Sequence, residues 1–228
     1  MVILSVDTST SAGSIVLSNG GERLVGEVNV YSEQTHSARL LPGIEILLKS
    51  AGLKLGQVDA FAVICGPGSF TGVRIGLATI KGLADCFSRP VISITAFEAW
   101  VEKFPEQPGI VVPVIDARRG EVYAATYRRF QGELSVLAPG IVEKAGVFFA
   151  NFPHHEACFV GSGASQYREL ILSGERPGWS ILPGDGFLGR PMTRIAHRKA
   201  KSSEVVSAAE LEAYYLRKSD AEMNWKEK

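Results

Sequence analysis

Two acidic residues occupy matching places in the sequence, each directly after a short apolar segment. Asp7 follows VILSV and Asp116 follows IVVPVI, and each opens a polar turn. A carboxylate at such a turn could hold Mg²⁺ or orient water in a kinase or ATPase, and it could equally bind the N–H groups of its own turn. Because the second turn lacks the run of small residues that would wrap a phosphate, we interpret both as degenerate phosphate turns. Their residues are Asp7, Thr8, Ser9, Asp116, Arg118 and Gly120.

A glycine-rich segment, GPGSFTG over 66–72, offers a second kind of chemistry. It joins an apolar run to the start of a helix, so its backbone N–H groups and the helix dipole could hold an anion. The residues concerned are Gly66, Gly68, Ser69 and Thr71. It is not a Walker loop, because the GK[ST] ending is absent. The alternative is a tight turn whose glycines let the helix pack closely.

The helix expected behind this turn has a core-facing stripe and, beside it, a face of small residues. The small residues are Gly72, Gly76 and Thr79. Two interior glycines, Gly76 and Gly82, each cost about 1 kcal/mol of helix propensity relative to Ala, so some close contact must offset them. Packing against a helix of the same chain and packing against a helix of another subunit both remain open.

Motifs of hydrolytic enzymes are absent from the sequence. It contains neither a GxSxG elbow nor an HExxH helix, and its four histidines do not have the spacing of metal ligands. The sequence therefore predicts no catalytic residues and no metal site.

Composition and charge argue against several further classes of protein. Among the 228 residues, Lys+Arg and Asp+Glu are both 24, whereas a stand-alone nucleic-acid binder is expected to carry a basic excess. Any RNA contact would therefore be shared with a more basic partner. Three cysteines without a CxxC pair fit a reducing compartment. No signal peptide is expected, and no apolar run approaches the roughly 20 residues of a membrane span. A soluble cytoplasmic protein is the expectation.

The elements that must position these residues form a repeated pattern. Apolar periodicity predicts strands at 2–6, 14–17, 22–30, 58–65 and 91–94, with helices at about 40–51, 72–87 and 96–103. Pro42 either opens the first helix or bends it. The second half predicts strands at 110–115, 121–127 and 133–137, a strand and helix over 159–172, a loop over 173–190 and a last helix at about 207–218.

The predicted fold class is α/β, a duplicated β-β-β-α-β-α arrangement of the actin/Hsp70/sugar-kinase (RNase H-like) type. The two subdomains are expected at 1–105 and 106–228, and the last helix either stays in the second or crosses back to the first. This fold alone does not assign a function.

With these motifs in view, the chain resembles the TsaB (YeaZ) family. The resemblance is carried by VDTS over 6–9, HSARLLP over 36–42, GPGSFTGVRIGLATIKGLA over 66–84, DARRGEVYAA over 116–125 and YLR over 215–217. These stretches span almost the whole chain, and the pair GPGSFTGxRIG and DARxGEVY is specific. Tyr214 stands where the family typically has proline, which leaves the end of the last helix open.

The resemblance implies a non-catalytic scaffold in tRNA N6-threonylcarbamoyladenosine modification. The implied partners are a TsaD-like transferase, a TsaE-like ATPase, a second copy of the chain, and tRNA through the complex; no membrane contact is implied. The transferase moves threonylcarbamoyl from threonylcarbamoyl-adenylate to the adenosine beside the anticodon. No cofactor is expected in the isolated chain, and ADP or ATP at the partner interface is left open. The alternatives are a glycoprotease-like peptidase acting on the TsaD-like partner and an actin-like ATPase.

The catalytic paralogues of this family carry an HxExH metal motif, which aligns here with Ala96, Glu98 and Trp100. Only the glutamate remains, and one carboxylate cannot hold a catalytic metal.

The family's partner surface is formed by the first two helices of the N-terminal domain, and paralogous surfaces of this kind also permit a homodimer. The implied residues are His36, Leu40, Leu41, Ile44, Phe70, Gly72, Val73, Ile75, Gly76, Thr79 and Leu83. Replacing Gly72 or Gly76 by Leu is accordingly expected to abolish pairing while leaving the fold intact.

Overall fold

The chain divides into two compact units. The computed structural model describes residues 1–228 except 21–22, 33, 174–175 and 218–228. Unit 1 comprises Met1–Phe104 and Asp185–Ala213, and unit 2 comprises Pro105–Gly184 and, among the described residues, 214–217. This differs from the expected second subdomain of 106–228, because the segment Asp185–Ala213 joins unit 1. Among the described residues, no helix combines the length and apolar character needed to cross a membrane.

Unit 1 is built on a five-stranded mixed sheet. Its strands are β1 (Val2–Asp7), β2 (Ala12–Asn19), β3 (Arg23–Tyr31), β4 (Ala60–Gly66) and β5 (Val91–Thr95), in the order β3-β2-β1-β4-β5. The first three strands pair antiparallel, whereas β4 and β5 run parallel to β1. Every residue of β4 is buried, and this explains its nearly continuous apolar sequence, since helices cover both faces of the sheet.

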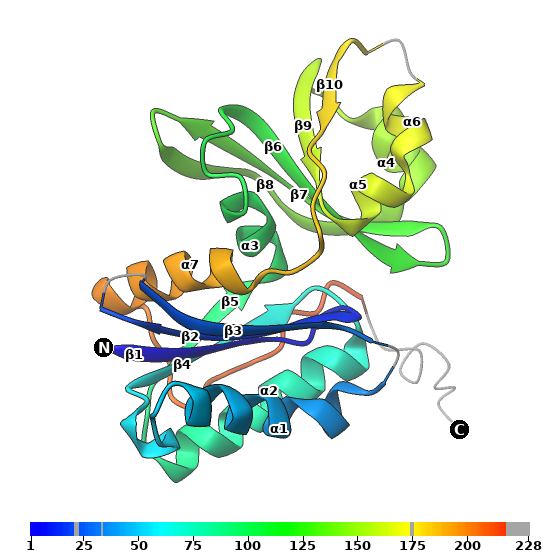
Figure 1. The fold of residues 1–228 in the computed structure, drawn as a ribbon. Coiled ribbons are helices and arrows are strands. Elements are labelled where there is room, and N and C mark those ends of the chain that lie inside the picture. Colours follow the sequence, from blue (N-terminus) through cyan, green and yellow to red (C-terminus); the bar gives the residue numbers. More distant parts are fainter. Residues whose placement is uncertain (21–22, 33, 174–175, 218–228) are drawn as a thin grey trace. The chain divides into compact units, whose positions relative to one another are not determined.

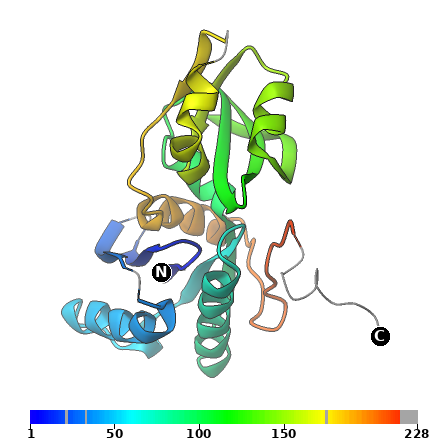
Figure 2. The same ribbon diagram turned by 90° about the vertical axis from the view of Figure 1, so that its right-hand side faces the viewer.

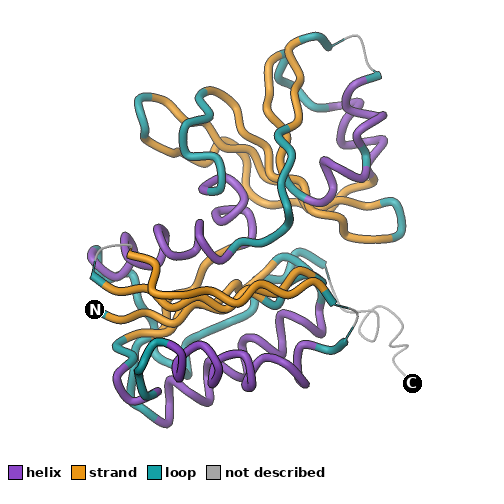
Figure 3. Tube along the Cα trace, viewed as in Figure 1, coloured by secondary structure: helices purple, strands orange, loops and turns teal. Residues whose placement is uncertain are grey.

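Helices lie on both faces of this sheet (Figure 1, Figure 2 and Figure 3). The helices are α1 (His36–Ser50), α2 (Phe70–Cys86), α3 (Ala96–Glu102) and α7 (Gly189–Lys201), and a short 3₁₀ helix η1 spans Leu55–Gln57. Helices α1 and α2 lie on one face, and α7 packs on the other face against β1 and β2 and beside α3. The segment that returns from unit 2 therefore completes the second helical layer.

Helix α1 begins six residues earlier than its proline. It starts at His36, so Pro42 lies inside the helix and the interpretation in which the helix begins at Pro42 is wrong. Proline cannot donate to the carbonyl four residues back. Because Pro42 is exposed, water can bond to that carbonyl instead.

Unit 2 repeats the sheet topology of unit 1. Its strands are β6 (Gly109–Arg118), β7 (Glu121–Phe130), β8 (Glu133–Lys144), β9 (Glu156–Val160) and β10 (Gly178–Ile181), in the order β10-β9-β6-β7-β8. The helices are α4 (Ala145–Asn151), α5 (Ser162–Gln166) and α6 (Arg168–Leu172). They cover one face of the sheet over an aromatic core in which the rings of Phe159 and Trp179 lie 4.9 Å apart. The predicted duplicated actin-like fold is confirmed.

Several predicted elements differ from the structure. The last helix at 207–218 is wrong for the residues described up to 217. Only a turn forms over 208–210, capped where Ser207 Oγ accepts from the Glu210 N–H, and Val206 pairs with Val91 of β5. The predicted loop at 173–190 contains β10 and the start of α7. The helix predicted up to 172 is broken into α5 and α6 at Tyr167.

Candidate functional site

The acidic turn of unit 1 is tied to the glycine-rich segment by hydrogen bonds. Asp7 Oδ1 accepts from the N–H of Ser9 at 2.8 Å and from its hydroxyl at 2.7 Å. The Thr8 hydroxyl donates to the Gly72 carbonyl at 2.7 Å, and the Ser69 N–H donates to the Ser9 carbonyl at 2.7 Å. The polar atoms of the turn are therefore largely bonded within unit 1.

Three glycines allow this close approach. A Cβ atom on Gly68 would lie 2.5 Å from the Ser9 carbonyl oxygen, and one on Gly72 would lie 2.0 Å from the Thr8 carbonyl oxygen. A Cβ atom on Gly76 would lie 2.4 Å from Thr8 Oγ1. Real Cβ atoms do not approach oxygen so closely, so these positions require glycine. The contacts favour the packing interpretation of GPGSFTG.

Binding of an anion by this segment stays a prediction, and two of its backbone donors already have partners. The Ser69 N–H bonds to Ser9, and the Gly72 N–H bonds to the Ser69 side chain, which is the N-cap of α2. Of the other three predicted residues, Gly66 ends β4, Gly68 packs against Ser9, and Thr71 lies exposed in the first turn of α2.

The Asp7 carboxyl is buried and has a raised pKa. It is 1% exposed, and burial raises its pKa to about 6, against the opposing effect of the bonds from Ser9. Its second oxygen, Oδ2, has no hydrogen-bond partner among the described residues. Ionisation of the Asp7 carboxyl therefore lowers the stability of the folded protein.

The acidic turn of unit 2 has the same local geometry. Asp116 Oδ1 accepts from the N–H two residues later, Arg118, at 2.9 Å, as Asp7 does from Ser9. The Asp116 N–H donates to the Ser162 hydroxyl, and a Cβ on Gly163 would lie 3.1 Å from the Asp116 nitrogen. In each unit, a glycine-containing strand–helix turn therefore packs on the acidic turn of the first strand. Both carboxylates shape their own turns.

The glutamate that aligns with the metal motif is fully engaged in structural bonds. Glu98 is the third residue of α3, and its Oε2 accepts from the N–H and the hydroxyl of Thr95, forming a capping box. Its Oε1 lies 2.6 Å from the Lys199 ammonium of α7, and both side chains are largely buried. A fixed ammonium thus supplies positive charge beside the one carboxylate of the motif. The neighbouring Ala96 and Trp100 are buried in the core and offer no ligand atoms.

The implied partner surface is only partly at the surface. Five of its residues are buried in unit 1, because their side chains or backbones pack against the unit's own strands and turns. They are Leu40, Ile44, Gly72, Val73 and Gly76. The six others are half-buried or exposed: His36, Leu41, Phe70, Ile75, Thr79 and Leu83. Leu41 is 54% exposed.

A stripe of half-buried and exposed residues, which we term the α2 outer face, follows helical spacing along α2. It comprises Ile75, Ala78, Thr79, Gly82 and Leu83. Its residues are apolar or small, and α2 packs beside α1 within unit 1. A Cβ on Gly82 would have no atom within 4 Å, in contrast to Gly72 and Gly76. The small-residue face that is open to another helix therefore lies at 78–82 and not at 72–76.

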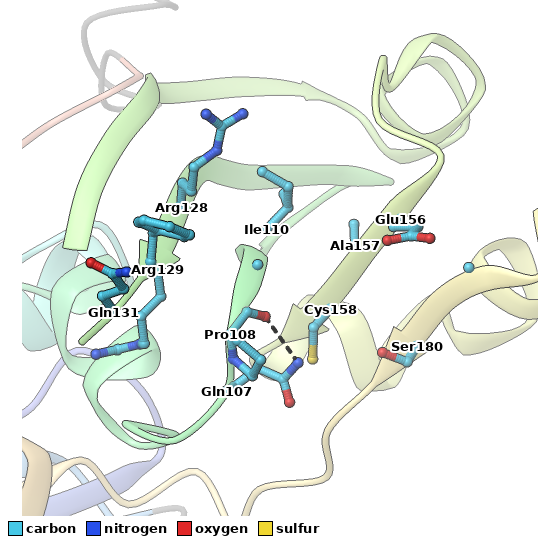
Figure 4. Close-up of a pocket in the computed structure, with 13 residues that line it drawn as sticks. Gln107, Pro108, Ile110, Arg128, Arg129, Gln131, Glu156, Ala157, Cys158 and Ser180 are labelled. Atoms are coloured by element: carbon cyan, nitrogen blue, oxygen red, sulfur yellow. Dashed lines mark hydrogen bonds between the residues drawn. The ribbon is translucent and has the colours of Figure 1, made fainter. Parts of the chain in front are cut away.

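A pocket in unit 2 was not predicted from the sequence. It has a volume of about 790 Å³ and is lined from four separate segments by residues that include Arg128, Arg129, Glu156, Cys158 and Ser180 (Figure 4). Burial raises the pKa of the Cys158 thiol, with a smaller opposing effect from Ser180. A thiol with a raised pKa is a poor nucleophile at neutral pH. No short sequence motif joins these residues, and only the sheet brings them together.

The fold, with two acidic turns each covered by a glycine-containing turn, defines a protein of the actin-like and sugar-kinase-like class. The family model described as TsaD, tRNA N6-adenosine threonylcarbamoyltransferase, matches residues 26–176. A tRNA threonylcarbamoyladenosine biosynthesis protein TsaB from Haemophilus influenzae is 35% identical over 99% of this chain and 96% of its own length. TsaB from Escherichia coli is 32% identical over 99% and 97%. The chain belongs to the TsaB family.

Solved structures agree with this assignment. YeaZ from Pseudomonas aeruginosa superposes with a TM-score of 0.80 at 30% identity, covering 94% of this chain and 99% of its own. Component A of (R)-2-hydroxyglutaryl-CoA dehydratase from Acidaminococcus fermentans has a TM-score of 0.51 at 12% identity, covering 88% of this chain and 99% of that one. This second likeness concerns the fold alone.

Proposed function

We propose that this protein acts in the cytoplasm as a non-catalytic scaffold in the biosynthesis of threonylcarbamoyladenosine in tRNA. In this role it pairs with a TsaD-like transferase and supports the transfer of threonylcarbamoyl to the adenosine beside the anticodon. The observation that carries the proposal is Glu98, because both oxygens of this one remaining motif carboxylate bond to residues of the chain itself. The names of the TsaB relatives and the match to the TsaD family model support the pathway.

The α2 outer face supports pairing with another helix. Gly82 lowers helix stability by about 1 kcal/mol relative to Ala, and an added Cβ there would meet no described atom within 4 Å, so no close contact in unit 1 requires glycine at this position. Small residues at helical spacing permit close approach of a second helix, and the flanking Ile75 and Leu83 supply apolar contact area. We assign this face, with the exposed Leu41 of α1, to the TsaD-like partner. A homodimer through the same face would compete with it.

The two alternative functions have weaker support. A peptidase needs an activated nucleophile, and the two buried cysteines, Cys65 and Cys158, both have thiol pKa values raised by burial. An ATPase would use Asp7, and its Oδ1 is occupied by Ser9 while the Thr8 hydroxyl bonds to α2. The buried Asp7 Oδ2 is the feature that an ATPase would still have to explain. We place any ADP or ATP at the partner interface rather than in this turn, and a TsaE-like ATPase completes the assembly.

The test is co-purification with a TsaD-like protein, followed by a modification assay on tRNA with and without this chain. The proposal requires a complex of defined mass and modification that depends on the chain. Turnover of ATP by the isolated chain, or specific cleavage of the TsaD-like protein, would instead establish one of the alternatives. A transferase that is fully active alone would contradict the scaffold role.

A further inference from the structure

The tip of the β6–β7 hairpin has an unusual backbone conformation. Arg118, Arg119 and Gly120 have φ values of 61°, 55° and 76°, so three consecutive residues are left-handed. Glycine adopts this conformation freely, and asparagine and aspartate tolerate it, whereas other residues cost roughly 1–2 kcal/mol each. Two arginines at these positions therefore lower the stability of the fold. Both arginine side chains are nevertheless exposed at this tip, and unfavourable backbone of this kind is often found at functional sites.

Two further cations converge on the same tip from distant parts of the chain. Lys144, at the end of β8, lies 3.2 Å from Glu121 Oε1 and donates to the Arg119 carbonyl at 3.0 Å. Arg217 donates to Glu121 Oε2 at 2.8 Å, and its side chain is only 17% exposed. The motifs DARRGEVY and YLR thus meet at the Glu121 carboxylate. The proposed scaffold role assigns no function to either motif.

The charges at the tip favour an anionic ligand. Glu121 is neutralised by two cations, which hold its carboxyl pKa below the usual range. Asp116 accepts from the Arg118 N–H and Glu143 from the Lys144 N–H, and these neutral donors do not cancel the charge of a carboxylate. The tip and its base therefore carry four cations against three carboxylates, a net charge of +1. Arg118 and Arg119 are exposed at its end. Arginine presents a planar set of donors that matches phosphate oxygens in pairs.

We propose that Arg118 and Arg119, held at the tip by Lys144, Glu121 and Arg217, contact the phosphate backbone of tRNA. This inference rests on the proposed function, since it makes the substrate RNA of that pathway the ligand. The zero net charge of the chain fits a contact that adds to an RNA surface supplied mainly by the partner. An acidic protein surface is the competing occupant, and the test separates the two.

The experiment measures binding of an unmodified tRNA transcript to the complex of this chain with its TsaD-like partner. Fluorescence anisotropy is recorded between 50 and 200 mM KCl for Arg118→Asn/Arg119→Asn, in which asparagine keeps the left-handed backbone at low cost. We expect about tenfold weaker binding and a salt slope reduced by about one to two. Arg118→Lys/Arg119→Lys keeps the charge but loses the paired donors, so it should keep the salt slope and bind with an affinity between those of the unaltered chain and the asparagine variant. Arg168→Asn, an exposed arginine on α6, is the matched control and should bind as the unaltered chain does.

Glu121→Gln should change the affinity for tRNA in the opposite direction. It removes the negative charge at the centre of the cluster and should strengthen binding about threefold. Equal affinity of the double asparagine variant and Arg168→Asn overturns the inference. Loss of pairing with the TsaD-like protein in the double variant also overturns it, because the tip would then be a protein contact. Failure of the unaltered chain to pair or to support modification would instead contradict the proposed function.

Discussion

Gly76 of α2 lies so close to Thr8 that a Cβ atom at position 76 would come within 2.4 Å of the Thr8 hydroxyl oxygen. This hydroxyl donates to the carbonyl of Gly72, one helical turn earlier. The contact fixes the acidic turn of unit 1 to the helix that follows the glycine-rich segment. It also explains why a helix interior contains a residue of poor helix propensity. The glycine serves the fold of the unit itself.

Gly76→Ala and Gly82→Ala should therefore have opposite effects on stability. At position 76 the added methyl group displaces Thr8, and we expect a net loss of about 1–2 kcal/mol in the free energy of unfolding. At position 82 the methyl group meets open space, and we expect a gain of about 0.5–1 kcal/mol. Urea denaturation of both variants checks the pair. Equal changes in the free energy of unfolding at the two sites would show that helix propensity alone determines the effect of the substitution.

Asp7→Asn should stabilise the protein at neutral pH. The pKa of Asp7 is raised in the folded state, so its charge opposes folding above a pH of about 6, and the penalty vanishes as the pH falls toward the unfolded value near 4. A shift of this size corresponds to a gain on the order of 2–3 kcal/mol at pH 7.5 and little gain at pH 4. Thermal unfolding across this range checks the prediction.

Asp85→Asn is the control for net charge, since Asp85 is exposed on α2. A gain that is equal for both variants, or one that grows as the pH falls, would contradict burial as the cause. Addition of Mg²⁺ gives a further readout. Stabilisation by Mg²⁺ that disappears in Asp7→Asn would support the ATPase alternative.

Lys199→Met should lower the stability of the protein, because it removes the ion pair between Lys199 and Glu98 of α3. Lys199 bonds to Glu98 Oε1 and to the Ser93 carbonyl, so its loss leaves a largely buried carboxylate with only its capping bonds. We expect a loss of about 1–2 kcal/mol, and much of it should be recovered in Lys199→Met/Glu98→Gln. A double-mutant cycle measured by denaturation checks the coupling. Additive effects of the two substitutions would mean that the pair contributes nothing of its own.

Local patterns predict this fold well where neighbours in sequence decide the structure. The strand before Asp7 and the strand before Asp116 both form, and both carboxylates bond to the N–H two residues later, as such turns commonly do. Helix α7 could not be predicted in the same way, because its apolar stripe is short. Its place is decided by packing on β1 and β2 and by pairs such as Lys199 with Glu98.

The site was harder to predict than the fold, because sequence spacing does not reveal which side of a helix faces its own unit. Gly72, Gly76 and Thr79 have the spacing of a docking face, yet the two glycines face Thr8 and only Thr79 reaches the surface. The convergence of Lys144 and Arg217 on Glu121 likewise depends on tertiary structure, which joins segments far apart in the chain.

The α2 outer face should decide pairing independently of stability. Gly82→Leu adds a side chain where no described atom lies within 4 Å, so the free energy of unfolding should stay equal or rise by up to about 1 kcal/mol. The same side chain would block the close approach of a second helix, and we expect loss of the complex with the TsaD-like partner and of any homodimer. Light scattering on the mixed proteins measures both.

Val136→Leu, on the exposed part of β8, enlarges an apolar side chain elsewhere and should leave pairing unchanged. Ile75→Glu places a charge within the same face and should also abolish pairing, since a carboxylate buried against an apolar helix has no partner. If Gly82→Leu folds normally and still forms both complexes, the partner surface lies elsewhere. The propensity lost at Gly82 would then need another explanation.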